Sequence, residues 1–141
     1  MRTDNRLSRV LHALLHLQDL DGPATSEQIG MMLNTNAAVV RRTMGGLREA
    51  GFVASVKGHG GGWTLARPLD QITLLALYDA LGEPSLFAVG RSEDAPGCQL
   101  EQAANAALSS ALDAARARFR QELSEVTVAD LRDRTAPGFS V

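Results

Sequence analysis

The sequence has a single cysteine, Cys98. One thiol excludes an internal disulfide framework, and it excludes any metal site built from several cysteines of one chain. No apolar run approaches the roughly 20 residues of a membrane-spanning helix, and the N-terminus, MRTDNRLSRV, lacks the uninterrupted apolar core of a signal peptide. We therefore expect a cytoplasmic protein with no membrane partner. Its 141 residues are 45% hydrophobic, enough for the core of one domain or of a small module with an extension.

A strong net charge is also absent, but the formal charge of -2 conceals a difference between the two halves of the chain. Residues 1–67 contain eight Lys and Arg against five Asp and Glu, a net +3, whereas residues 68–141 contain six against eleven, a net -5. All three histidines, His12, His16 and His59, lie in the first half. This distribution predicts a module that faces an anion, joined to an acidic module.

The first predicted elements are two helices. Leucines and a valine recur at spacings of three and four over residues 5–19, which indicates an amphipathic helix. The short helix SEQIGMML follows, and Thr25 and Gln28 have the spacing of a capping box at its head. Residues 34–36 are polar and predict a tight turn after this helix.

A third helix is predicted over residues 37–50. Val40, Met44 and Leu47 are spaced to form its buried side, and Gly51 stands where a left-handed C-cap glycine belongs. Two short helices joined by a tight turn, after a longer supporting helix, form a helix-turn-helix.

A β-hairpin is predicted next, because the strand-like runs FVASV and WTLA flank the glycine-rich stretch VKGHGGGW. Three helices followed by a hairpin is the element order of a winged helix. Residues 1–67 are therefore predicted to be a winged helix-turn-helix DNA-binding domain, with the glycines at the tip of the wing.

The second half is predicted to be helical. In residues 68–98, Thr73 can cap a linker helix through LLALYDALG, and SLFAVGRSEDAPG follows as a partly apolar, sensor-like loop. Residues 99–141 contain one long helix, to about Glu125, and a short final helix that Thr127 can cap. The fold class is therefore mainly α with a small β-hairpin wing.

The long helix is predicted to mediate dimerisation. About 27 residues of helix span roughly 40 Å, which is more than a core of this size needs to cover. Many alanines keep its surface narrow, so another helix can pack closely against it. The alternative is a helix folded back over its own domain. The predicted apolar stripe consists of Leu108, Leu112, Ala115, Phe119, Leu123 and Val126.

The exposed side of the third helix is predicted to be small, basic and nearly free of acid. Two glycines inside a helix cost about 1 kcal/mol each relative to alanine, and close approach to a DNA major groove would offset that cost, with arginines bonding guanine edges or phosphates. A solvated face that carries two arginines is the alternative. The face consists of Ala38, Val39, Arg41, Arg42, Gly45 and Gly46.

The glycine loop does not match a nucleotide-binding motif. It has no Gly-Lys-Ser/Thr, and the third glycine of G-x-G-x-x-G would fall on Trp63. A flexible hairpin turn usually needs only one or two glycines, whereas a wing tip pressed against a sugar-phosphate backbone needs more. The predicted contacts to the backbone or minor groove are Lys57, Gly58, His59 and Gly60.

Residues 6–67 resemble the Rrf2 family of bacterial transcription regulators, and the similarity extends more loosely to about residue 134. The wing SVKGHGGGW is the most specific part of the resemblance. The resemblance implies a homodimer in which a long C-terminal helix crosses its partner, with a sensor loop ahead of that helix. VVRR, SLFAV and the lone cysteine are most similar to a branch of the family that lacks the cluster-binding motif.

Family members that bind iron-sulfur clusters have three cysteines in the sensor loop, and only Cys98 matches, at the last of the three positions. We therefore expect no cofactor and no cluster of that kind. In a minority mode of the family, the first helix of the partner subunit supplies ligands. His12 occupies a comparable place, but one cysteine and one histidine fall short of the usual ligand number.

Cys98 and the histidine pair leave alternatives open. The start of a long helix favours a thiolate at Cys98, which could then respond to an oxidant; a small buried apolar residue without chemistry is the alternative. His12 and His16 are spaced to chelate a metal, but they lie opposite the leucine stripe and are better explained as surface or interface residues, so no metal site is predicted.

We therefore predict a homodimeric transcription regulator, a repressor, that binds double-stranded DNA at a near-palindromic operator and responds to an oxidant or an unidentified small molecule through the Cys98 region. It is not predicted to be an enzyme, because no acid-base constellation is present. The alternatives are a protein-binding winged helix and a metal- or cluster-dependent sensor. The residues predicted to enter the major groove are Thr35, Asn36, Ala38, Val39, Arg41 and Arg42.

Overall fold

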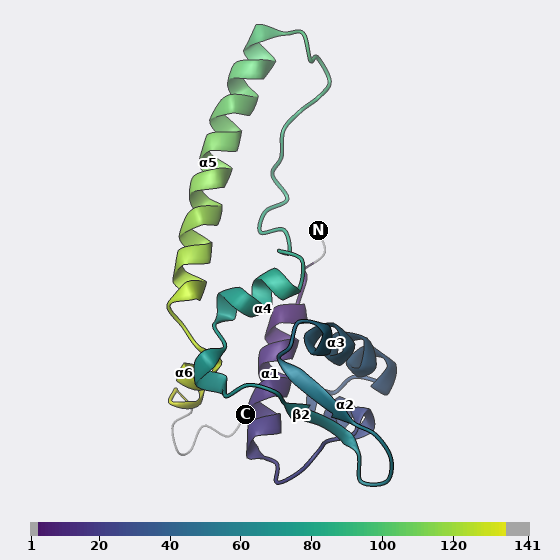
Figure 1. Cartoon of the computed structure of the whole chain (residues 1–141). Helices are drawn as coiled ribbons and strands as arrows, with labels where there is room; N and C mark the ends of the chain where they lie inside the picture. Colours follow the sequence, from purple (N-terminus) through teal and green to yellow (C-terminus); the bar gives the residue numbers. More distant parts are fainter. Residues whose placement is uncertain (1–2, 135–141) are drawn as a thin grey trace.

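The computed structural model describes residues 3–134 and has the predicted fold class, helices with a single antiparallel hairpin (Figure 1). The winged-helix part consists of α1 (Arg6–Asp19), α2 (Ser26–Leu33), α3 (Ala37–Glu49), β1 (Val53–Val56) and β2 (Gly62–Leu65). The remainder consists of the 3-10 helix η1 (Leu69–Gln71), α4 (Leu74–Ala80), α5 (Gln99–Ser124) and α6 (Val128–Arg132).

The predicted signals at the ends of α2 and α3 are confirmed. Thr25 and Gln28 form the reciprocal capping box at the start of α2, with the Gln28 N–H donating to Thr25 Oγ1 over 3.1 Å. After α3, Gly51 has a φ of +86°, and the Phe52 N–H donates to the Leu47 carbonyl over 2.9 Å. This is a Schellman ending, which turns the chain sharply from the recognition helix into the hairpin.

The wing is fixed to the core through Trp63 of β2. Trp63 on β2 is 8% exposed, and its indole N–H donates to Ser26 Oγ over 3.0 Å. Its backbone also pairs with Ala24, through a Trp63 N–H to Ala24 carbonyl bond of 2.7 Å and a return bond of 3.0 Å. The hairpin is therefore anchored both to the chain before α2 and to α2 itself, which confirms that Trp63 ties the wing to the core.

One hydrophobic core joins the winged helix to the C-terminal part. Ile72 and Val128 are fully buried in the same cluster as α1, and the Val128 N–H donates to the Ile72 carbonyl over 2.9 Å. The Leu74 N–H donates to the Val126 carbonyl over the same distance. The predicted division of the chain after residues 67 and 98 stays a prediction. The end of the C-terminal segment, residues 135–141, lies outside the described residues.

Helix α5 extends away from the winged helix as an arm, with the linker running beside it (Figure 1). Near the end of α5, Phe119 packs edge-on against Tyr78 of α4 with ring centroids 5.4 Å apart, and Arg120 bonds Asp79 over 2.6 Å. Much of the remaining surface of α5 is exposed, and Leu100 is 82% exposed. The arm therefore does not fold back over its own winged helix. No described helix is long and apolar enough to cross a membrane.

The wing glycines lead to a prediction about stability. A Cβ at Gly62 would lie 2.5 Å from the Ala24 carbonyl oxygen, and φ there is +149°, whereas Gly58, with φ of +91°, has open space around it. Gly62→Ala should lower the free energy of unfolding by about 3 kcal/mol, and Gly58→Ala by about 1 kcal/mol. Urea unfolding at a fixed protein concentration measures both, and equal losses would contradict the role assigned to Gly62.

Candidate nucleic-acid interface

The exposed face of α3 is the one predicted from the sequence. Val40, Met44 and Leu47 are buried, while Arg41 and Arg42 are exposed on the other side. Ala38 and Gly46 are also exposed, and Val39 and Gly45 are partly exposed. A Cβ at either glycine would meet no other atom within 4 Å. Packing within the chain therefore does not require glycine at these positions, and the narrow surface faces outward.

The turn between α2 and α3 has a structural role that sequence reasoning missed. Asn36 is the N-cap of α3, and its Oδ1 accepts a hydrogen bond from the Val39 N–H over 2.9 Å. The Thr35 N–H donates to the Gly30 carbonyl over 2.8 Å, and a Cβ at Gly30 would lie 2.7 Å from the Thr35 oxygen. The Asn36 side chain therefore keeps its amide NH₂ and one acceptor site on Oδ1 for another partner.

The basic face is not as free of acid as predicted. Arg41 lies 3.4 Å from the carboxylate of Glu27, which comes from α2, and both side chains are more than half exposed. The sequence pattern missed this pair because the two residues belong to different helices. An exposed pair of this kind contributes about 0–1 kcal/mol, so an approaching phosphate can replace Glu27. Arg42 has no ion pair among the residues described.

The wing tip carries an exposed cation. Lys57, the only lysine of the chain, and His59 are both exposed. Gly58 and Gly60 have φ of +91° and +76°, values that favour glycine, in open space. A Cβ at Gly61 would lie 2.2 Å from the Val56 carbonyl oxygen. Gly61, like Gly62 beside the Ala24 carbonyl, is therefore required by contacts within the chain, which corrects the idea that all the glycines serve an approaching backbone.

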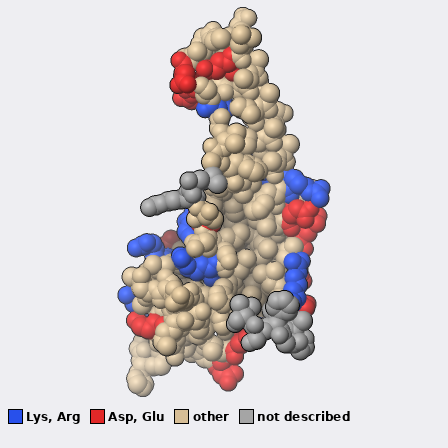
Figure 2. Space-filling view, turned by 180° about the vertical axis from the view of Figure 1, so that it is seen from behind, with Lys and Arg blue, Asp and Glu red and all other residues tan. Residues whose placement is uncertain are grey.

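The two ends of the molecule differ in charge. Helix α3 and the wing lie at the end away from the arm (Figure 1), and Lys and Arg side chains gather over the winged helix in the view from behind (Figure 2). Acidic side chains gather near the tip of the arm in the same view, where the loop before α5 contains Glu93 and Asp94 and the first turn of α5 contains Glu101. The acidic cluster near the tip of the arm is therefore separate in space from the basic side chains over the winged helix, while Arg116, Arg118 and Arg120 also place basic charge on α5.

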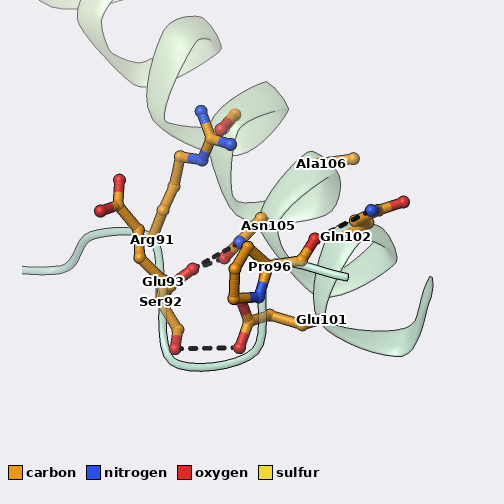
Figure 3. A pocket seen from close by; sticks show the side chains of 9 residues that line it. Arg91, Ser92, Glu93, Pro96, Glu101, Gln102, Asn105 and Ala106 are labelled. Atoms are coloured by element: carbon orange, nitrogen blue, oxygen red, sulfur yellow. Dashed lines mark hydrogen bonds between the residues drawn. The ribbon is translucent and has the colours of Figure 1, made fainter. Parts of the chain in front are cut away.

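The loop before α5 is held by side chains of that helix (Figure 3). Asn105, the only buried residue of α5, accepts from the Ser92 N–H over 3.0 Å and donates to the Ser92 carbonyl over 2.7 Å. The Glu101 carboxylate accepts from the Ala95 N–H over 2.9 Å. Sequence reasoning missed this anchor; the available signal was one asparagine within a run of alanines. The loop is thus ordered by α5 rather than by the core.

Cys98 is the N-cap residue of α5, and it is exposed. The backbone N–H groups of Glu101 and then Leu100 lower the pKa of its thiol, as predicted for a cysteine at a helix start, although neither forms a cap hydrogen bond of ordinary geometry. In this chain the alternative of a buried apolar residue is wrong.

The histidine pair lies on α1. The Nε2 atoms of His12 and His16 are 2.9 Å apart, so the two rings share one hydrogen bond. Burial, and secondly the neighbouring His16, lower the pKa of His12. No group of three or more His, Cys, Asp or Glu that could hold a metal ion occurs within residues 3–134.

Two relatives in Bacillus subtilis (strain 168) carry descriptions as candidate HTH-type transcriptional regulators. YwnA is 30% identical over 91% of this chain and 95% of its own length. YwgB is 33% identical over 62% of this chain and 58% of its own length. The similarity to YwnA thus includes the arm as well as the winged helix.

Solved structures share the fold. IscR of T. potens superposes with a TM-score of 0.71 at 20% identity, covering 99% of this chain and 95% of that chain. The oxidised form of CymR from Staphylococcus aureus also has a TM-score of 0.71, at 19% identity, covering 97% of this chain and 100% of that chain.

The Rrf2 family model, described as an iron-dependent transcriptional regulator, matches residues 3–134. Within the described residues of one chain no iron site is assembled: the one cysteine starts α5 at the tip of the arm, and α1, with its histidines, lies away from that tip in Figure 1. Family membership rests instead on the match along the whole described chain, together with YwnA and the shared fold. The chain belongs to the Rrf2 family of DNA-binding transcription regulators.

Proposed function

We propose that the protein is a homodimeric repressor that binds a near-palindromic operator through α3 and the wing. The observation that carries this proposal is the exposed side of α3, where Arg41 and Arg42 flank a surface of small residues that packing does not explain. Small residues let a helix enter the major groove deeply, and arginine forks suit guanine edges and phosphates. The residues that we assign to the groove are Thr35, Asn36, Ala38, Val39, Arg41 and Arg42.

The wing would hold the DNA beside the major groove. Lys57 supplies a mobile charge for phosphate, and the backbone N–H groups near Gly58 and Gly60 are open to an approaching strand because no side chain covers them. His59 is exposed between them. These four residues are assigned to the flanking backbone or minor groove.

A dimer follows from the open arm. Leu100 and Leu108 are exposed apolar residues on α5, and alanines keep the surface around them narrow. A second copy of α5 would cover them. Two-fold symmetry then places the recognition helices in grooves about 34 Å apart, or a multiple of that distance.

A protein-binding winged helix is less well supported than DNA binding. The large apolar side chains exposed in the described residues lie elsewhere in the fold, and none of them is on α3. The exposed part of α3 is polar, small or cationic, which suits phosphates and base edges better than an apolar partner surface.

We also propose that the protein works without an iron-sulfur cluster and that Cys98 is its redox-sensitive group. With a peroxide, the thiolate would form a sulfenic acid and release hydroxide. The Cys98 thiolate of the second protomer would then displace another hydroxide and close a disulfide, so that the two thiolates lose the two electrons that the peroxide gains. Such a bond would fix the two arms together and alter the spacing of the wings.

Two substitutions distinguish recognition of the base sequence from contact with the DNA phosphates. Arg42→Ala should lower affinity for an operator selected from random duplexes by about 1–3 kcal/mol and should blur the preference for it. Lys57→Ala should weaken binding to selected and scrambled duplexes alike and reduce the slope of log affinity against log salt by about 1. Fluorescence anisotropy over a salt series measures both quantities.

The matched control is Arg118→Ala, which removes an exposed arginine on α5 that pairs with Glu122. It should leave affinity and salt slope unchanged. If Arg42→Ala and Lys57→Ala behave identically on selected and scrambled DNA, the assigned roles are wrong.

The lowered pKa of Cys98 predicts early alkylation. Because the N–H groups at the start of α5 stabilise the thiolate, the rate of reaction with iodoacetamide should reach half its maximum at a lower pH than for free cysteine. Mass spectrometry of the intact protein over a pH series measures this rate, with Cys98→Ser as the blank. A midpoint at or above that of free cysteine would exclude an activated thiol.

A further inference from the structure

A cavity of about 410 Å³ lies where the start of α1, helix α4, the linker and α5 meet. This volume is in the range of small-molecule sites. The linker segment SLFAV, which the DNA-binding function does not use, contributes part of its wall. The apolar lining consists mainly of Leu7, Tyr78, Pro84, Leu86, Phe87 and Phe119.

The lining favours a flat, apolar molecule. Tyr78 and Phe119 meet edge to face, and the Tyr78 hydroxyl is already committed to the Pro84 carbonyl over 2.5 Å. The tyrosine therefore presents a fixed ring rather than a free polar group. Phe87 is 49% exposed, so the chain itself leaves this ring only half covered. Aromatic rings from the linker, α4 and α5 thus line one cavity, an arrangement that suits ring stacking.

The polar side of the cavity selects against anions. Asp4 lines it, and hydrogen bonds from the Arg6 side chain and backbone lower the pKa of the Asp4 carboxyl, which therefore stays ionised. The Arg6 side chain is held against this carboxylate and is not among the lining residues. Because Arg6 already occupies both oxygens of this carboxylate and most of the remaining lining is apolar, a ligand carboxylate would lose its hydration here without gaining a free cation, so the cavity favours an uncharged molecule.

The volume does not suit a partner helix. One turn of a helix about 10 Å wide and about 5.4 Å in pitch already occupies roughly the whole cavity. A second copy of α5 could cover the mouth of the cavity, but it could not lie within it. A molecule of one or two rings fits the space.

A second, smaller cavity links this place to the recognition helix. It measures about 170 Å³ and lies between the start of α1, the end of α4 and helix α3. Arg6 of α1, together with Ala80 and Leu81 at the end of α4, faces Arg42 and Gly46 of α3 across it. Leu7 and Tyr78 of the larger cavity are therefore within one helical turn of Arg6 and Ala80, which line the smaller cavity together with Arg42.

We propose that the cavity between α1, α4, the linker and α5 binds an uncharged aromatic molecule of one or two rings, and that its occupancy changes the position of Arg42. The binding site stands on the cavity alone, whereas its effect on DNA rests on the proposed function. A ligand shifts DNA affinity only if it binds the two arrangements of α1 and α4 unequally.

The binding test uses the full-length ¹⁵N-labelled protein with indole and p-cresol as probes and benzoate as the anionic counterpart. At millimolar concentration, indole or p-cresol should shift the backbone amide signals of Leu7, Tyr78 and Phe87, and benzoate should not. Phe87→Ala should weaken probe binding about tenfold. Val89→Ala is the matched control: Val89 is on the same linker and 60% exposed, but it does not line the cavity, so affinity should be unchanged.

Each outcome is decisive. No shift with either neutral probe, equal binding of benzoate, or equal behaviour of the two linker variants overturns the site. If the probe binds there but leaves the operator affinity of the wild type unchanged, the link to Arg42 is wrong; a change of at least about threefold that Phe87→Ala abolishes supports it. Failure of the probe-free protein to bind any selected DNA would refute the proposed function and leave the binding result intact.

Discussion

The rest of the structure depends on a short closure between residues 72–74 and 126–128. The Val128 N–H bonds the Ile72 carbonyl, the Leu74 N–H bonds the Val126 carbonyl, and both Ile72 and Val128 are fully buried against the core of α1. The chain leaves the winged helix just after this point and returns to it at the end of the arm. Two backbone hydrogen bonds and the buried contact of Ile72 with the Val128 segment fix both ends of the arm. A movement of α5 would therefore also be transmitted to α1 and α4.

This closure makes α1 the element that the arm and the DNA-reading end share. On one side, α1 packs beneath the helix-turn-helix, whose wing is fixed through Trp63 and Ala24; on the other it packs against α4 and α6. The exposed faces of α3 and α5 are two parts of the fold that the chain does not cover by itself. One is basic and small, and the other is apolar and narrow, so the same scaffold presents one face suited to nucleic acid and another suited to a second copy.

Local chemistry was predictable from the sequence, and contacts between distant segments were not. Capping at Thr25, the Gly51 ending and the buried side of α3 follow from spacings within one helix, and the structure confirms them. The Arg41–Glu27 pair, the close approach of Gly62 to Ala24 and the burial of Val128 join segments far apart in the chain, and no local period encodes them. The N-cap role of Asn36 could have been predicted from its place just before α3, but this residue had been assigned only to DNA contact. The roles in DNA binding stay predictions.

The central claim is that α3 and the wing bind DNA together. It is tested most directly at Lys57 in the wing, because this is the only lysine of the chain and its labelling can be measured alone. Acetylation with an amine-specific reagent, followed by mass spectrometry, reports on this one side chain, and the terminal α-amine of the same molecule serves as the reference. The account predicts that saturating operator duplex slows acetylation of Lys57 at least about tenfold and leaves the terminal amine unaffected. Equal labelling of Lys57 with and without duplex, under conditions where the duplex is bound, would contradict it.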